Sequence, residues 1–169
     1  SRTSALRIAN AQVGEGDAGQ SAVVFSVTLD PAASVEVSIR YATSGGSAAF
    51  PDDFAAESGT LTFAAGATSQ QISVDVQGDS LDEADETFRV TLSGPTGGAS
   101  VADGTADGTI LDDDPLPQLA IANASVAEGD AGTTALALSV TLAPASGRTV
   151  TVGYATSAGS ARSGTDYTS

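Results

Sequence analysis

The sequence of 169 residues contains no cysteine, histidine, tryptophan or methionine. Without cysteine the chain can form neither disulfides nor thiolate metal sites. Without histidine or cysteine it also lacks the usual general bases and the ligands that soft metals prefer. The metal chemistry that remains uses oxygen ligands alone, which suits hard cations such as calcium.

Basic residues are scarce as well. The chain has six arginines, no lysine and 21 acidic residues, which gives a formal net charge of −15. Nucleic-acid binding needs clustered lysine and arginine, so this balance excludes a nucleic-acid partner. A charge of this size keeps a protein soluble but destabilises its compact state by self-repulsion. Bound divalent cations would relieve that repulsion.

Long apolar runs are also missing from the chain. No run approaches the roughly 18 residues of a membrane span, and no signal peptide is visible. The sequence therefore predicts no membrane span in this fragment. Its opening residues, Ser1, Arg2, Thr3 and Ser4, are those expected of a piece excised from a longer protein.

An internal repeat organises what is present. Residues 6–11 recur at 119–124, residues 15–19 at 128–132 and residues 41–44 at 154–157, each displaced by 113 positions. The repeat predicts a complete unit at residues 1–114, a linker at 115–118 and the first half of a second unit at 119–169. Pro115 and Pro117 stiffen the linker, so neighbouring repeats of the chain are expected to meet at a defined angle.

Within the first unit apolar residues recur with a period of two, which is typical of strands with one buried face. The alternating apolar positions are Val23, Phe25, Val27, Leu29, Val35, Val37, Ile39, Tyr41, Leu61, Phe63, Ile72, Val74, Val76, Phe88, Val90 and Leu92. Clusters of Gly, Asp, Pro and Ser separate these runs. About seven strands in roughly 110 residues predict an all-β fold, a Greek-key immunoglobulin-like β-sandwich in tandem repeat with the second copy truncated.

Acidic residues collect in the loops between these strands. Glu15 follows the first strand, Asp52 and Asp53 follow the third, residues 79–86 precede the Phe88 strand, and residues 112–114 end the last one. Loops of different strands can meet at one pole of a sandwich, and calcium takes six to eight oxygen ligands. Solvated acidic loops and a cation site both remain open on this reasoning. A glycosidase-like carboxylate pair is disfavoured, because such a cleft needs aromatic platforms and only 5% of residues are aromatic.

The order of several motifs carries a resemblance to a known family. These are residues 15–17 (Glu-Gly-Asp), 41–44 (Tyr-Ala-Thr-Ser), 58–66, 82–88 and 108–114, together with 159–167 in the second copy. The series resembles the Calx-beta domain, the calcium-binding sandwich repeat of sodium–calcium exchangers and of many bacterial surface proteins. The resemblance implies Ca²⁺ ligands at Glu15, Asp53, Asp79, Glu83, Glu86, Asp112, Asp113 and Asp114. The chain departs from the pattern at Gly78, where exchanger domains often carry an acid, and in the loop of residues 50–54.

We therefore expect a non-enzymatic, calcium-binding repeat that acts as a structural or adhesive module of a larger bacterial surface or secreted protein, located outside the cell. The alternative is a regulatory calcium sensor whose interdomain geometry changes on binding. The truncated second copy retains only Glu128 and Asp166 as matches of predicted ligands. Its apolar strand faces predict either self-association of two chains or disorder beyond about Leu119.

Overall fold

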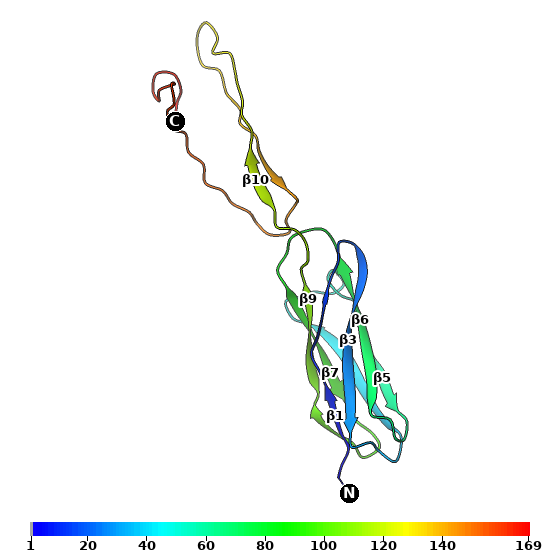
Figure 1. Cartoon of the computed structure of the whole chain (residues 1–169). Helices are drawn as coiled ribbons and strands as arrows, with labels where there is room; N and C mark the ends of the chain where they lie inside the picture. Colours follow the sequence, from blue (N-terminus) through cyan, green and yellow to red (C-terminus); the bar gives the residue numbers. More distant parts are fainter. Residues whose placement is uncertain (1) are drawn as a thin grey trace.

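The computed structural model describes residues 2–169 and shows a β-sandwich followed by an extended two-stranded part (Figure 1). The strands of the sandwich are β1 (Ala5–Ile8), β2 (Ala11–Gly14), β3 (Gly19–Asp30), β4 (Val37–Gly45), β5 (Ser58–Phe63), β6 (Ser69–Gly78), β7 (Glu86–Ser93), β8 (Ser100–Asp103) and β9 (Thr105–Leu111). The extended part contains β10 (Gln118–Ile121) and β11 (Val140–Ala143). The predicted all-β, immunoglobulin-like sandwich is confirmed.

The two sheets of the sandwich have the strand orders β6-β3-β1-β8 and β2-β9-β7-β4-β5. The first strand predicted from the sequence is divided between them. Its first part, β1, pairs antiparallel with β3, whereas β2 crosses over and pairs parallel with β9. This crossing brings the end of β2 beside the end of β9, which places Glu15 next to the acidic residues after Leu111.

The core lies between the sheets and follows the predicted alternation. The inward apolar residues of β3, β6 and β7 are buried, among them Phe25, Val74 and Phe88. Val35 is an exception: the prediction that it faces the core is wrong, and its side chain is 53% exposed. The reason is that β4 begins only at Val37, so Val35 lies in the turn before the strand.

Three phenylalanines pack at the centre of this core. Phe88 stacks on Phe54 with ring centroids 4.6 Å apart and meets the edge of Phe25 at 5.8 Å. Gly108 leaves the room for this arrangement, because a Cβ there would lie 2.6 Å from Phe88 and 2.7 Å from Phe25. Phe54 comes from a loop that bridges to Val76 of β6. Its burial therefore anchors the loop that carries Asp53.

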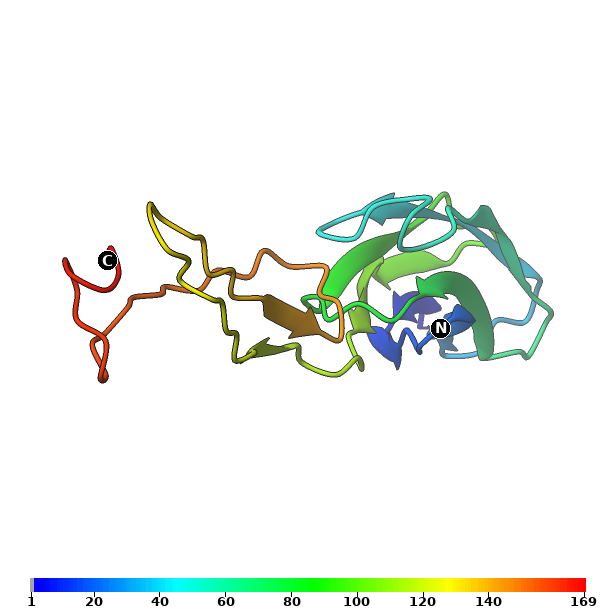
Figure 2. The ribbon, with the colours of Figure 1, turned by 90° about the horizontal axis from the view of Figure 1, so that it is seen from above.

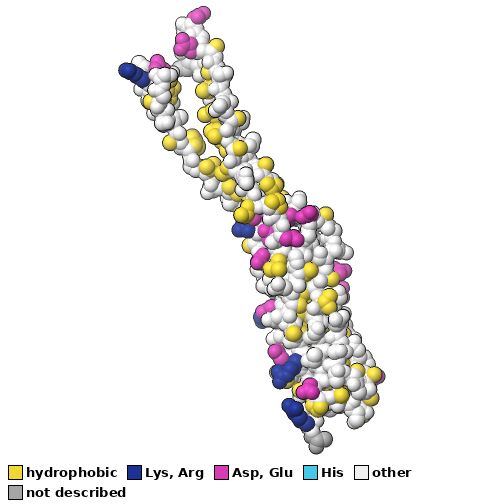
Figure 3. Space-filling model, viewed as in Figure 1, with side chains coloured by type: hydrophobic (Ala, Val, Ile, Leu, Met, Phe, Trp, Pro, Cys, Tyr) yellow, Lys and Arg dark blue, Asp and Glu magenta, His cyan; other side chains and the backbone are white. Residues whose placement is uncertain are grey.

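The second unit repeats the first without its core. Strands β10 and β11 pair Leu119 with Leu142, in the same register in which β1 and β3 pair Leu6 with Leu29. Figures 1 and 2 show this part leading away from the sandwich, and Figure 3 shows apolar side chains open along it. Its exposed large apolar residues are Leu119, Ile121, Val126, Leu136, Leu138, Val140, Leu142, Val150, Val152 and Tyr154. Association between two chains stays a prediction.

Among residues 2–169 the structure contains no helix that is long and apolar enough to cross a membrane.

Candidate metal centre

Strand pairing brings the acidic loops together at one pole of the sandwich. Gly14 at the end of β2 pairs with Leu111 at the end of β9, and the amide of Glu15 donates a hydrogen bond to the Leu111 carbonyl at 3.1 Å. Glu86 at the start of β7 pairs with Ile110. The residues that follow or begin these strands are acidic, so adjacent strands deliver their carboxylates to the same place.

The centre of this pole is formed by Glu15, Asp112 and Asp114. One carboxylate oxygen from each lies within 4.8 Å of the other two. Glu15 is only 8% exposed. Oδ1 of Asp112 and Oδ2 of Asp114 are buried and have no hydrogen-bond partner among the described residues. Buried polar atoms are nearly always paired, so two partnerless oxygens beside a buried carboxylate fit the oxygen-only ligand set of calcium.

The electrostatics of Glu15 show which other acids surround it. The pKa of Glu15 is raised to about 7, chiefly by burial and then by the negative charges of Asp79, Glu83, Asp112 and Asp114, in that order of size. The pKa of Asp114 is raised by desolvation and then by the charge of Asp17, a residue that is not among the predicted ligands. These shifts mean that the pole holds its negative charge at a cost in free energy.

A second part of the pole lies around Asp53 and Glu86. Burial raises the pKa of Glu86 to about 7, aided by a hydrogen bond to Asp53 and by the charges of Asp53 and Glu83. Glu83 belongs to both parts: its pKa is raised by burial, then by Asp79 and Asp53. Asp53 also accepts a hydrogen bond from the amide of Ala49 at 2.7 Å, which closes its own loop.

Two predicted ligands also hold the backbone of the loops. Asp113 is exposed and accepts a hydrogen bond from the amide of Gly16 at 3.0 Å. Asp79 accepts one from the amide of Leu81 at 2.7 Å. The structure thus places all eight predicted ligands at the same pole, with Glu15, Asp112 and Asp114 at its centre. Their role as ligands stays a prediction.

Gly78 explains one departure from the pattern of exchanger domains. A Cβ at this position would clash with the backbone carbonyls of Glu15 and Gly16. The Gly78→Asp variant is therefore expected to lose about 1–3 kcal/mol in free energy of unfolding, because the overpacked turn must move. Urea denaturation measures this loss. Gly153→Asp adds the same charge where nothing lies within 4 Å of the new Cβ, and should leave the midpoint unchanged.

The raised pKa values predict how stability depends on pH without calcium. Glu15 and Glu86 have pKa values of about 7 in the folded chain against the ordinary glutamate value of 4.5, so the folded state binds more protons than the unfolded state between these pH values. The free energy of unfolding should therefore fall as pH rises from about 4.5 to 7. Urea unfolding of the calcium-free protein across this range measures it, and Glu15→Gln should flatten the dependence. Equal or higher stability at pH 7 would contradict the expectation.

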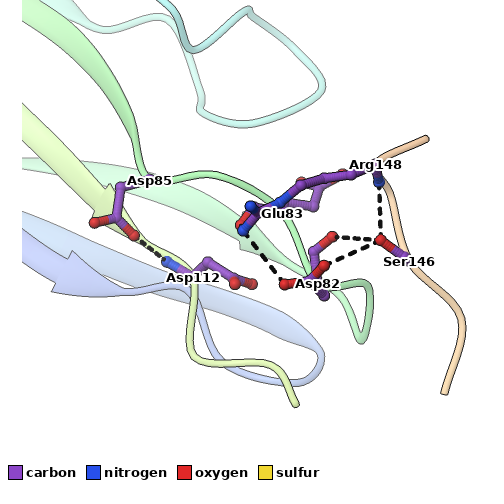
Figure 4. Close-up of polar contacts among 6 residues, drawn as sticks. All are labelled: Asp82, Glu83, Asp85, Asp112, Ser146 and Arg148. Atoms are coloured by element: carbon purple, nitrogen blue, oxygen red, sulfur yellow. Dashed lines mark hydrogen bonds and ion pairs between the residues drawn. The ribbon is translucent and has the colours of Figure 1, made fainter. Parts of the chain in front are cut away.

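A contact that the sequence analysis did not predict lies next to the pole. Asp82, which is only 4% exposed, accepts hydrogen bonds from Ser146 and Arg148 of the second unit (Figure 4). Figure 4 also shows Asp85, which accepts a hydrogen bond from the amide of Asp112 at 3.1 Å. The sequence held one signal for this contact. Arg148 is a charged residue at the position where the first unit has an uncharged one, Val35.

The fold and this pole define a β-sandwich repeat with a carboxylate-rich end. The family model for the Calx-beta domain matches residues 4–114 and again residues 116–169. The chain belongs to the Calx-beta domain family and carries two of its repeats in tandem. No curated protein matches it in sequence.

Solved structures agree with this assignment. CBD12 from CALX1.2 is 28% identical with a TM-score of 0.57, over 64% of this chain and 45% of that one. The chain thus spans less than half the length of that structure. The Calx CBD1 domain in its apo form is 27% identical with a TM-score of 0.56, over 67% of this chain and 100% of that domain. The calcium binding domain CBD12 of CALX1.1 is 28% identical with a TM-score of 0.56, over 66% of this chain and 47% of that one.

Proposed function

We propose that the pole of the first repeat binds calcium. The observation that carries this proposal is the pair of buried, partnerless oxygens on Asp112 and Asp114 beside the buried carboxylate of Glu15. These three residues would hold the ion. Asp79 and Glu83 raise the pKa of Glu15, so their charges are close enough to assist. A bound cation supplies the positive charge that this pole of the chain lacks.

Asp53 and Glu86 would hold a second ion or extend the first site. They share a hydrogen bond, and the pKa of Glu83 is raised by burial, then by Asp79, by Asp53, and by Asp112 and Asp114 of the central group. Two neighbouring carboxylates are stabilised in a charged state when a cation lies between them. Asp113 would contribute mainly by holding Gly16, and with it the turn that carries Glu15.

The role that fits this site best is structural and non-enzymatic. The strands of the first repeat lead along one axis into the second repeat, so the chain is elongated (Figure 1). An ion at the pole would fix the loops from which the second repeat departs. An array of such repeats would serve as a stiff or adhesive module of a bacterial surface or secreted protein, and the chain would then lie outside the cell.

A regulatory calcium sensor is the second candidate, and one residue favours it. Glu83 lies in the acidic cluster through its carboxylate, while its backbone carbonyl accepts a hydrogen bond from Arg148 of the second repeat. An ion that moves Glu83 would therefore act on the joint between the repeats.

Calcium titration calorimetry on the whole chain tests the proposal and separates the candidates. Sensors bind calcium with dissociation constants of about 10⁻⁷–10⁻⁵ M, and extracellular modules with about 10⁻⁴–10⁻³ M. We expect saturable binding in the weaker range, with a stoichiometry of at least one ion per chain. The absence of any saturable heat up to several millimolar calcium would overturn the proposal.

A further inference from the structure

The joint between the two repeats is built around one buried carboxylate. Oδ2 of Asp82 accepts a hydrogen bond from Ser146 Oγ at 3.0 Å, and Oδ1 accepts one from Arg148 Nη2 at 3.3 Å. The carbonyl of Asp82 accepts a hydrogen bond from the amide of Gly147 at 3.0 Å. The Arg148 guanidinium also donates to the carbonyl of Glu83. Residues 146–148 therefore lie against Asp82 through both side-chain and backbone groups (Figure 4).

We propose that Asp82 and the carbonyls beside it are a docking site for the Ser146-Gly147-Arg148 turn of the following repeat. This contact holds the two repeats in one relative orientation when no calcium is bound. The inference goes beyond the proposed calcium function, because it concerns what holds the repeats together when no ion is bound.

The hydrogen bonds of the contact use groups other than the carboxylates proposed to hold calcium. Asp82 uses both of its oxygens on the second repeat, and Glu83 accepts a hydrogen bond through its carbonyl while its carboxylate lies against Gly147. A buried carboxylate is stable when a cation and hydrogen-bond donors neutralise it, and Arg148 and Ser146 supply both. Removal of the arginine leaves the buried charge of Asp82 without its counter-ion, so the joint must open to hydrate it.

The site also selects its partner by shape. A Cβ on residue 147 would clash with the side chain of Glu83, so the middle position of the turn has to be glycine for Glu83 to stay in place. The first repeat has Ala33, Ser34 and Val35 at the corresponding positions. These lack the hydroxyl at the first position, the glycine at the second and the cation at the third. The docking site therefore accepts the second repeat and rejects the first repeat of another chain.

Distance measurements between two spin labels test the joint directly. The chain contains no cysteine, so Ser73→Cys on β6 and Ser139→Cys beside β11 place one exposed label in each repeat. Pulsed electron paramagnetic resonance on the labelled chain, diluted with an excess of unlabelled chain to suppress distances between two chains, should give one narrow distance distribution in chelator. Millimolar calcium should leave its mean unchanged. Arg148→Ala and Asp82→Asn should each lose the narrow distribution, with calcium and without it.

Two matched variants serve as controls. Arg162→Ala removes an arginine of the second repeat that lies outside the joint, and should retain the narrow distribution. Gly147→Ala should lose it, whereas Gly153→Ala, where nothing lies within 4 Å of the new Cβ, should not. Calorimetry on Arg148→Ala shows separately whether the first repeat still binds calcium, so this inference and the proposed function can fail independently.

Three results would overturn the inference. The first is a broad distribution in chelator that narrows only with calcium, which would instead support the sensor. The second is an unchanged narrow distribution in Arg148→Ala. The third is a narrow distribution that returns in Arg148→Ala when calcium is added, because the ion would then set the geometry of the joint.

Discussion

Replacing Asp112 and Asp114 together by asparagine should abolish the stabilisation by calcium and raise the stability of the calcium-free protein. Both residues contribute buried, partnerless oxygens, so their neutral forms remove two charges from the proposed site. Because ligand charge tunes calcium affinity over several orders of magnitude, binding should weaken on the order of 100-fold or more. The same charges raise the pKa of Glu15, so their loss relieves repulsion when no ion is bound.

Thermal unfolding in chelator and in calcium measures both effects. For the unaltered chain, calcium at 100 times its dissociation constant adds about 2.7 kcal/mol. That corresponds to a rise in melting temperature on the order of 10 °C for a domain of this size. The double variant should melt above the unaltered chain in chelator and show little further rise with calcium.

A charge-matched control separates the site from the general acidity of the chain. Asp75 on β6 and Asp103 on β8 are exposed and lie on strands rather than in the acidic loops. Replacing both by asparagine makes the same change in net charge and should preserve the calcium response. If the Asp112 and Asp114 variant responded to calcium as fully as this control, these residues would not be ligands.

The strands of the first repeat could be predicted from the sequence because their physics is local. Alternation of apolar and polar residues reports which face of a strand is buried, and Phe25, Val74 and Phe88 are buried as predicted. Val35 fits the same alternation but precedes the first residue of β4. Periodicity shows which face of a strand is buried, but it does not show at which residue the strand begins to pair. The wrong prediction for Val35 therefore arises at the boundary of a strand.

Contacts between distant residues could not be derived from local pattern. The convergence of Glu15 with Asp112 depends on the parallel pairing of β2 with β9, and that pairing depends on the chain crossing between sheets at residues 9 and 10. The resemblance to a family supplied this grouping, and periodicity could not. Asp82 was one acid among several in its loop, and only the fold shows that it turns to the second repeat.

The incomplete second repeat leads to the other large expected effect. Leu138 and Val140 are 52% and 51% exposed, while their counterparts in the first repeat, Phe25 and Val27, are 0% exposed. The free edge of β11 is the one that β6 covers in the first repeat. An open apolar face beside an unpaired strand edge favours pairing with another chain. We therefore expect two chains to associate through their second repeats.

The distribution of charge along the chain favours association through the second repeats over association through the first. Residues 1–118 hold four arginines against 18 acidic residues, whereas residues 119–169 hold two against three. Two first repeats repel one another, and two second repeats nearly lack that repulsion. Light scattering coupled to size exclusion should give twice the mass of one chain at high protein concentration. The dimer should persist at low salt, since apolar contact and strand pairing hold it.

Leu138→Asp should return the chain to a monomer, because it places a carboxylate at the centre of the apolar face. Val24→Asp makes the same kind of change at an exposed apolar residue of β3, on the outer face of the first repeat, and should leave the dimer intact. A chain of residues 1–118 keeps the whole buried core and should be monomeric at every concentration. A full chain that runs as a monomer at high concentration, with slow hydrogen exchange across residues 119–169, would show that the half repeat is stable alone and would refute this prediction.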